Sequence, residues 1–155
     1  MISVQAEIFD PGKCLNAFTK DHTDMGAVVS FTGHVRDYAS RANHTSDVSI
    51  LHLQHYPNYT DSEISKIEQQ AQKRWPGIRT LIIHRYGDLY PGDPIVFVAV
   101  ASAHRKTAFD AATFLMDYLK TDAPFWKKEN RNDGAFWIEP KDSDRQARKI
   151  WQETS

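Results

Sequence analysis

Hydrophobic and polar residues along the chain follow two periods, one typical of strands and one typical of helices. Residues 2–8 place an apolar side chain at every second position, which predicts a half-buried strand. Four more strands are predicted from runs rich in apolar and β-branched residues: 26–35, 48–56, 80–86 and 95–101. The run 95–101 is almost continuously apolar, so we expect it near the centre of a sheet.

Helical spacing appears in four other segments. A short helix is predicted to begin at Pro11 with Asp10 as its N-cap. Thr60 and Glu63 have the spacing of a capping box, which predicts a second helix that Pro76 ends. A third helix with a narrow face of small residues is predicted over 102–120, with its first serine as the cap. The fourth is an amphipathic helix after residues 142–143.

Between the last two helices, residues 125–129 and 136–138 are predicted to pair as a hairpin. Residues 37–47 are polar and lack periodicity, which predicts a mobile loop. With no repeat and no convincing linker, the order of elements predicts a single α+β domain over 1–155, with mixed sheet pairing.

Composition narrows the classes of function. The chain has 155 residues and is 41% hydrophobic, enough for one core, and its net charge of -1 argues against a protein that coats nucleic acid. Any anion site must therefore be a local cluster of cations. No apolar run approaches the roughly 20 residues of a membrane span, and the N-terminus lacks the features of a signal peptide, so we expect a cytoplasmic protein.

The sequence gives little support for a metal site or for a reactive cysteine. Cys14 is the only cysteine, which excludes an intrachain disulfide and a cysteine-rich metal cluster, and among Leu15 and Phe18 it is typical of a small buried hydrophobe. His52 and His55 are three apart in a predicted strand and therefore point to opposite faces. We expect no metal and no other cofactor.

Basic residues near the third helix are the strongest candidates for chemistry. His104 and Arg105 stand at its predicted start, where free backbone N–H groups favour an anion. Lys120 and Lys127 flank apolar residues that would lower the pKa of a lysine, and Arg36 ends a predicted strand. Each of these side chains could instead be an ordinary solvated charge, and the sequence alone leaves that alternative open.

Six segments together resemble the large, catalytic subunit of molybdopterin synthase, the MoaE family: 26–36, 53–57, 83–85, 87–93, 102–105 and 116–127. The resemblance implies an α/β-hammerhead-type fold and a homodimer within a heterotetramer. Each end of that dimer would bind a small ubiquitin-like sulfur-carrier subunit, whose C-terminal Gly-Gly thiocarboxylate delivers sulfur. The substrate implied is cyclic pyranopterin monophosphate, which gains the dithiolene of molybdopterin, so the enzyme would be a sulfurtransferase.

Individual roles follow from the same resemblance. Lys120 and Lys127 match the catalytic lysines, which also contact the substrate. The other implied substrate-binding positions are His34, Val35, Arg36, His104, Arg105, Lys128, Glu129 and Lys141. Two of them depart from the family pattern, because His34 replaces a lysine and Lys141 replaces an arginine.

Two other classes of function compete with this hypothesis. A non-catalytic module could keep the fold and only dock a ubiquitin-like partner, although it would not need clustered cations that are costly to desolvate. A phosphohydrolase would need a metal cluster or an activated nucleophile, and neither is visible.

Overall fold

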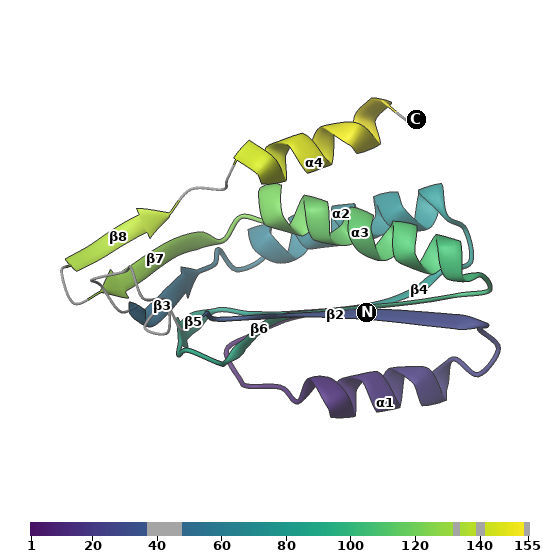
Figure 1. The fold of residues 1–155 in the computed structure, drawn as a ribbon, viewed down its shortest axis with the longest axis horizontal. Coiled ribbons are helices and arrows are strands. Elements are labelled where there is room, and N and C mark those ends of the chain that lie inside the picture. The colour runs from purple at the N-terminus through teal and green to yellow at the C-terminus, as the bar shows by residue number, and fades with distance from the viewer. Residues whose placement is uncertain (37–47, 132–133, 139–141, 154–155) are drawn as a thin grey trace, which may run out of the picture.

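The structure is a computed structural model that describes residues 1–36, 48–131, 134–138 and 142–153. Two four-stranded sheets and four helices make up this part of the chain (Figure 1). The helices are α1 (Pro11–Asp21), α2 (Tyr59–Arg74), α3 (Arg105–Thr121) and α4 (Asp142–Glu153). The loop expected over 37–47 lies outside the described residues, as does Lys141.

The first sheet, here called the large sheet, has the strand order β1 (Ile2–Gln5), β4 (Arg79–Arg85), β6 (Pro94–Ser102) and β2 (Ala27–His34). Strands β1 and β4 are parallel, whereas β6 pairs antiparallel with both β4 and β2. The expected α+β class with mixed pairing is therefore confirmed. The central place of β6 is also confirmed, because eight of its nine residues are buried.

The second sheet, here called the hairpin sheet, is antiparallel throughout. Its order is β5 (Gly87–Leu89), β3 (Val48–Gln54), β7 (Trp126–Arg131) and β8 (Gly134–Ile138). The expected hairpin is thus confirmed as β7 and β8. The three-residue strand β5 was not predicted, because its turn-like residues gain a strand conformation only by pairing with β3.

Helices cover both faces of the large sheet (Figure 1). On one face, α2 and α3 bury an apolar core that includes Ile64, Ile82 and Leu115. On the other face, α1 packs Phe18 against a cluster that contains Phe97. Helix α4 lies along α3, outside the sheet layers. No described helix has both the length and the apolar composition needed to cross a membrane.

Helix starts show where local sequence misleads. Asp10 caps α1 as expected, since its carboxylate accepts the Lys13 N–H at 3.1 Å. The capping box at Thr60 is wrong: α2 begins earlier, and the buried Thr60 hydroxyl accepts the Tyr56 N–H at 3.0 Å. Ser102 is also not the N-cap of α3, because it is the last residue of β6. Both residues assigned to caps have other roles: the Thr60 hydroxyl also donates to the distant Pro124 carbonyl at 3.5 Å, and Ser102 extends a strand.

Strand β1 is shorter than the alternating pattern suggested. It ends at Gln5, and Ile8 is 66% exposed, although the period of two continues to that residue. Only residues 2–5 have a neighbouring strand, β4, to pair with. Alternation alone therefore overestimated its length.

Candidate active site

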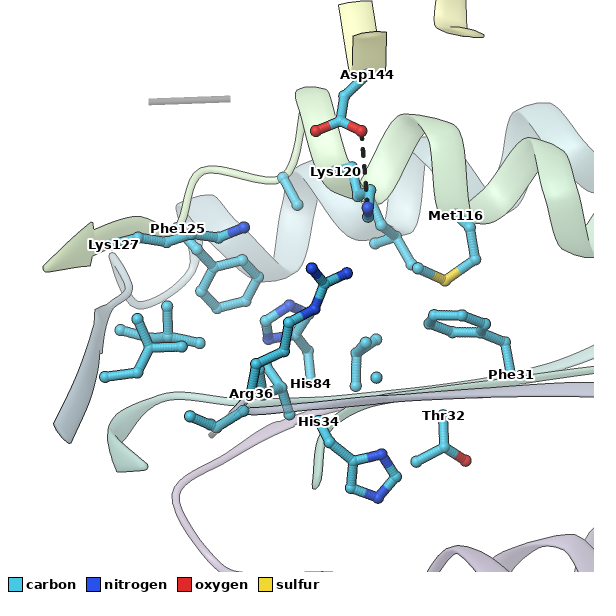
Figure 2. Close-up of a pocket in the computed structure, with 18 of the residues that line it drawn as sticks. Phe31, Thr32, His34, Arg36, His84, Met116, Lys120, Phe125, Lys127 and Asp144 are labelled. Carbon is cyan, nitrogen blue, oxygen red and sulfur yellow. Dashed lines mark ion pairs between the residues drawn. The ribbon is translucent and has the colours of Figure 1, made fainter. Parts of the chain in front are cut away.

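A pocket of about 660 Å³ lies where the two sheets meet the end of α3 (Figure 2). Its walls come from the end of β2, strands β3 and β7, the last turns of α3 and the first turn of α4. Phe31 and Met116 give it an apolar side (Figure 2). Charged groups enter from several elements, so only the tertiary structure brings them together.

Lys120 comes from the last turn of α3. Its side chain is about half exposed, and its Nζ lies 3.6 Å from Oδ1 of Asp144 on α4 (Figure 2). Two further contacts fix α4 on α3: the Trp151 indole N–H donates to Asp117 at 2.8 Å, and Arg148 pairs with Asp122 at 2.8 Å. The helix therefore holds a carboxylate beside Lys120 at the edge of the pocket.

Lys127 comes from the hairpin sheet. In β7 it lies opposite Leu53 of β3, and the alternation of the strand sends Lys127 and Glu129 to the pocket side. Lys127 is exposed to solvent, but the protein around its amine partly desolvates it and lowers its pKa, and the positive charge of Lys120 lowers that pKa further. Asp144 and Glu129 act in the opposite direction. The net effect favours the neutral amine relative to an ordinary lysine.

Arg36 supplies the third cation. It follows the end of β2, and its guanidinium points toward the space between Lys120 and Lys127 (Figure 2). Val35 is buried beneath it, and its N–H donates to the Asp93 carbonyl at 2.9 Å. That bond fixes the backbone from which Arg36 projects.

Two predicted site residues at the start of α3 lie outside the pocket. His104 and Arg105 stand exposed at the start of α3, whereas Lys120 is in its last turn. Fifteen residues of helix correspond to about 22 Å, so within one chain they do not join the pocket. The substrate-binding positions that the resemblance implies therefore do not all meet in the pocket of one chain.

Neighbours of the catalytic candidates also divide between two faces. Glu129 is buried and lines the pocket, but Lys128 points to the other face of the hairpin sheet, 5.7 Å from the centre of the Trp137 ring. His34 borders the pocket, yet its ring points away from the three cations (Figure 2). Strand alternation explains the position of Lys128.

His84 and Asp144 line the pocket but were not predicted from the sequence, and His84 is the more deeply buried of the two. His84 lies in the segment 83–85 that carried part of the family resemblance, but no role was expected for it. The ring is 7% exposed, stacks on Phe125 with centroids 3.8 Å apart, and lines the pocket. Burial lowers the pKa of His84 to about 4. The available signal was a polar residue at the end of an otherwise apolar strand pattern.

Other candidate chemistry is not supported by the geometry. Among the described residues, no three His, Cys, Asp or Glu side chains are grouped as metal ligands. His52 pairs with Asp88 at 2.6 Å, while His55 stacks on Tyr86. Cys14 lies on α1 and packs against the core, and burial raises the pKa of its thiol. This environment suits a hydrophobic role for Cys14.

Comparison with known proteins identifies relatives over nearly the whole chain. Residues 4–122 match the family model described as MoaE protein. A protein from Pseudomonas aeruginosa named molybdopterin synthase catalytic subunit is 50% identical over 152 residues, covering 98% of this chain and 99% of the relative. A solved structure, the molybdopterin biosynthesis MoaE protein from Burkholderia ambifaria, is 40% identical with a TM-score of 0.82, covering 98% and 97% of the two chains.

The fold also extends to a more distant relative. A protein-protein complex of subunits 1 and 2 of molybdopterin-converting factor from Helicobacter pylori contains a chain with a TM-score of 0.72 at 19% identity, covering 89% of this chain and 90% of that one. At that identity the likeness concerns the fold. The family model and the close relatives together show that this chain belongs to the MoaE family.

Proposed function

We propose that this chain is the catalytic subunit of a molybdopterin synthase and acts as a sulfurtransferase. It would take sulfur from the C-terminal thiocarboxylate of a small ubiquitin-like subunit and transfer it to cyclic pyranopterin monophosphate. The observation that carries this proposal is the convergence of Lys120, Lys127 and Arg36 on one pocket with apolar walls. Both reacting partners are anions, and such a pocket favours them.

The two lysines differ in their surroundings, which suggests different roles. Lys127 is the better proton acceptor, because its lowered pKa increases the fraction of neutral amine. Lys120 contacts a carboxylate at the edge of the pocket and is suited to stabilise negative charge on the thiocarboxylate or on the reacting group. Arg36 can bind the substrate phosphate through two parallel hydrogen bonds.

The other substrate-binding positions that the resemblance implies differ in how close they lie to this pocket. Val35, His34 and Glu129 border the same pocket and can shape its edge. Because His104 and Arg105 lie far from the pocket of their own chain, we assign them to the pocket of a second copy in the proposed homodimer. Lys128 could contact substrate only from the opposite face of the hairpin sheet, and Lys141 stays a proposal from the resemblance.

The partner in this proposal is a second, smaller protein. The Helicobacter pylori relative was solved as a complex of two subunits, and the Pseudomonas relative is named a catalytic subunit. Both descriptions support a second kind of subunit as the partner, and the family resemblance implies that two large and two small subunits form a heterotetramer. The non-catalytic docking module fits less well, since it gives no reason to desolvate the amine of Lys127 and to place a second cation beside it.

Reconstitution tests the proposal directly. The purified chain is mixed with thiocarboxylated small subunit and cyclic pyranopterin monophosphate, and dithiolene formation is followed. Lys120→Ala should abolish product while leaving partner binding intact. Lys106→Ala is the matched control, because Lys106 lies on the same helix but pairs with Asp110 at 2.8 Å, outside the pocket. A stable complex without turnover by the unmodified chain would favour the docking module instead.

A further inference from the structure

His84 interrupts an apolar strand face at the point where the core becomes a pocket. Alternation along β4 places Thr80, Ile82 and His84 on the face that α2 and α3 cover. Ile82 is completely buried there, whereas His84 lines the pocket. A polar ring with 7% exposure needs defined partners, since burying an unpaired polar group is costly.

The hydrogen bond of His84 fixes which nitrogen carries the proton. Nδ1 lies 2.9 Å from the backbone carbonyl oxygen of Arg85. A carbonyl oxygen can only accept, so Nδ1 donates and carries the hydrogen. In the neutral ring Nε2 is then an acceptor, and no residue in the described part of the chain donates to it. His84 therefore offers a free acceptor at the pocket.

Two features keep this acceptor neutral and oriented. Burial lowers the pKa of His84 to about 4, and the nearby positive charge of Lys127 also lowers it, so the ring is uncharged near neutral pH. The nearly parallel stack on Phe125, with 12° between the ring planes, and the bond to Arg85 hold the ring plane. A ligand group that approaches Nε2 thus meets a fixed lone pair.

The acceptor differs from every charged group around it. Lys120, Lys127 and Arg36 only donate hydrogen bonds when charged, and they favour an anion. The two carboxylates of the pocket, Asp144 and Glu129, raise the pKa of Lys127. A neutral imidazole can accept a hydrogen bond from a ligand N–H without raising the pKa of Lys127. The pocket therefore combines donors for a phosphate with one neutral acceptor for a ligand N–H.

We propose that His84 determines specificity: its Nε2 accepts a hydrogen bond from an N–H of the pterin ring and so orients the ring, while Arg36 holds the phosphate end. This inference rests on the proposed function, because it takes the substrate to be a phosphorylated pterin. Pterins carry N–H donors on their pyrimidine edge, and the flat ring suits a pocket bordered by Phe31 and Phe125. A site lined only by cations would not select among phosphorylated compounds.

Equilibrium binding without the small subunit tests the inference apart from catalysis. Calorimetry is used to measure the Kd of cyclic pyranopterin monophosphate, and inorganic phosphate serves as a competitor. His84→Phe keeps an aromatic ring but removes the acceptor. The loss of one hydrogen bond should raise the Kd of the pterin about fivefold to tenfold, while the competition constant of phosphate stays unchanged. His84→Gln, whose side-chain carbonyl can accept, should recover part of the affinity.

A matched control is available in the same chain. His55 also stacks on an aromatic ring, Tyr86, at 3.8 Å, but does not line the pocket, so His55→Phe should leave both constants unchanged. Equal pterin affinity in His84→Phe and the unmodified chain would overturn the inference and leave the proposed function standing. Equal weakening of pterin and phosphate would overturn it as well, since it would indicate general damage to the pocket. Absence of pterin binding to the unmodified chain would refute the proposed substrate and the inference together.

Discussion

Acid should destabilise this protein through His84, and the effect can be calculated from its surroundings. The pKa of His84 is about 4 in the folded chain, against an ordinary value of 6.5. As pH falls below 6.5, the unfolded chain binds a proton that the folded chain does not bind until pH 4. Stability is therefore lost across this window and by no further amount below it. The gap corresponds to about 3 kcal/mol in total, and to about 2 kcal/mol between pH 7.5 and pH 5.

Urea unfolding of the unmodified chain and of His84→Phe at these two pH values measures the effect. Other groups titrate in both proteins, so the difference between them isolates His84. The variant loses the bond to the Arg85 carbonyl at every pH, so its absolute stability is not the relevant quantity. If His84→Phe also lost as much stability between pH 7.5 and 5 as the unmodified chain does, His84 could not be the buried neutral group described above.

Two further predictions concern the pocket and the core. Lys120→Met removes a neighbouring cation and should raise the pKa of Lys127, so acetylation of Lys127 at a fixed pH, measured by mass spectrometry, should become slower. Asp144→Asn should lower the pKa of Lys127 and make the same acetylation faster. An unchanged acetylation rate in both variants would contradict this. Leu115→Ala should reduce the free energy of unfolding, measured with urea, by about 3–5 kcal/mol, because this side chain of α3 is completely buried against the large sheet. A loss below about 1 kcal/mol would contradict this and show that the surrounding residues collapse into the cavity.

Much of the fold could be predicted because its elements carry strong local signals. The run 95–101 has a continuous apolar pattern that is typical of a central strand, and it lies in β6. Asp10 and Pro11 form a local helix start, and the structure confirms it. Predictions failed where a residue has a tertiary partner. Thr60 has the sequence features of a cap, but it lies within α2, completely buried, and its hydroxyl donates to the distant Pro124 carbonyl at 3.5 Å.

The candidate site was only partly accessible from sequence. Lys120 and Lys127 stood out because of the apolar residues between them, and the structure places both in one pocket with Arg36. Asp144 gave no signal, since an acidic residue in the first turn of a helix is ordinarily explained by the helix dipole. Its position beside Lys120 depends on how α4 packs against α3, which is a long-range contact.

The sequence by itself determined the local periods, the helix and strand types, and the presence of basic residues in segments that resemble one family. Tertiary structure alone decided which of those residues meet. It separated His104 and Arg105 from Lys120 by the length of α3, because a helix is a rigid spacer of fixed rise. It also made His84 a neutral acceptor, because the pKa of a side chain depends on burial and on charges brought close by folding, and neither is encoded in neighbouring residues.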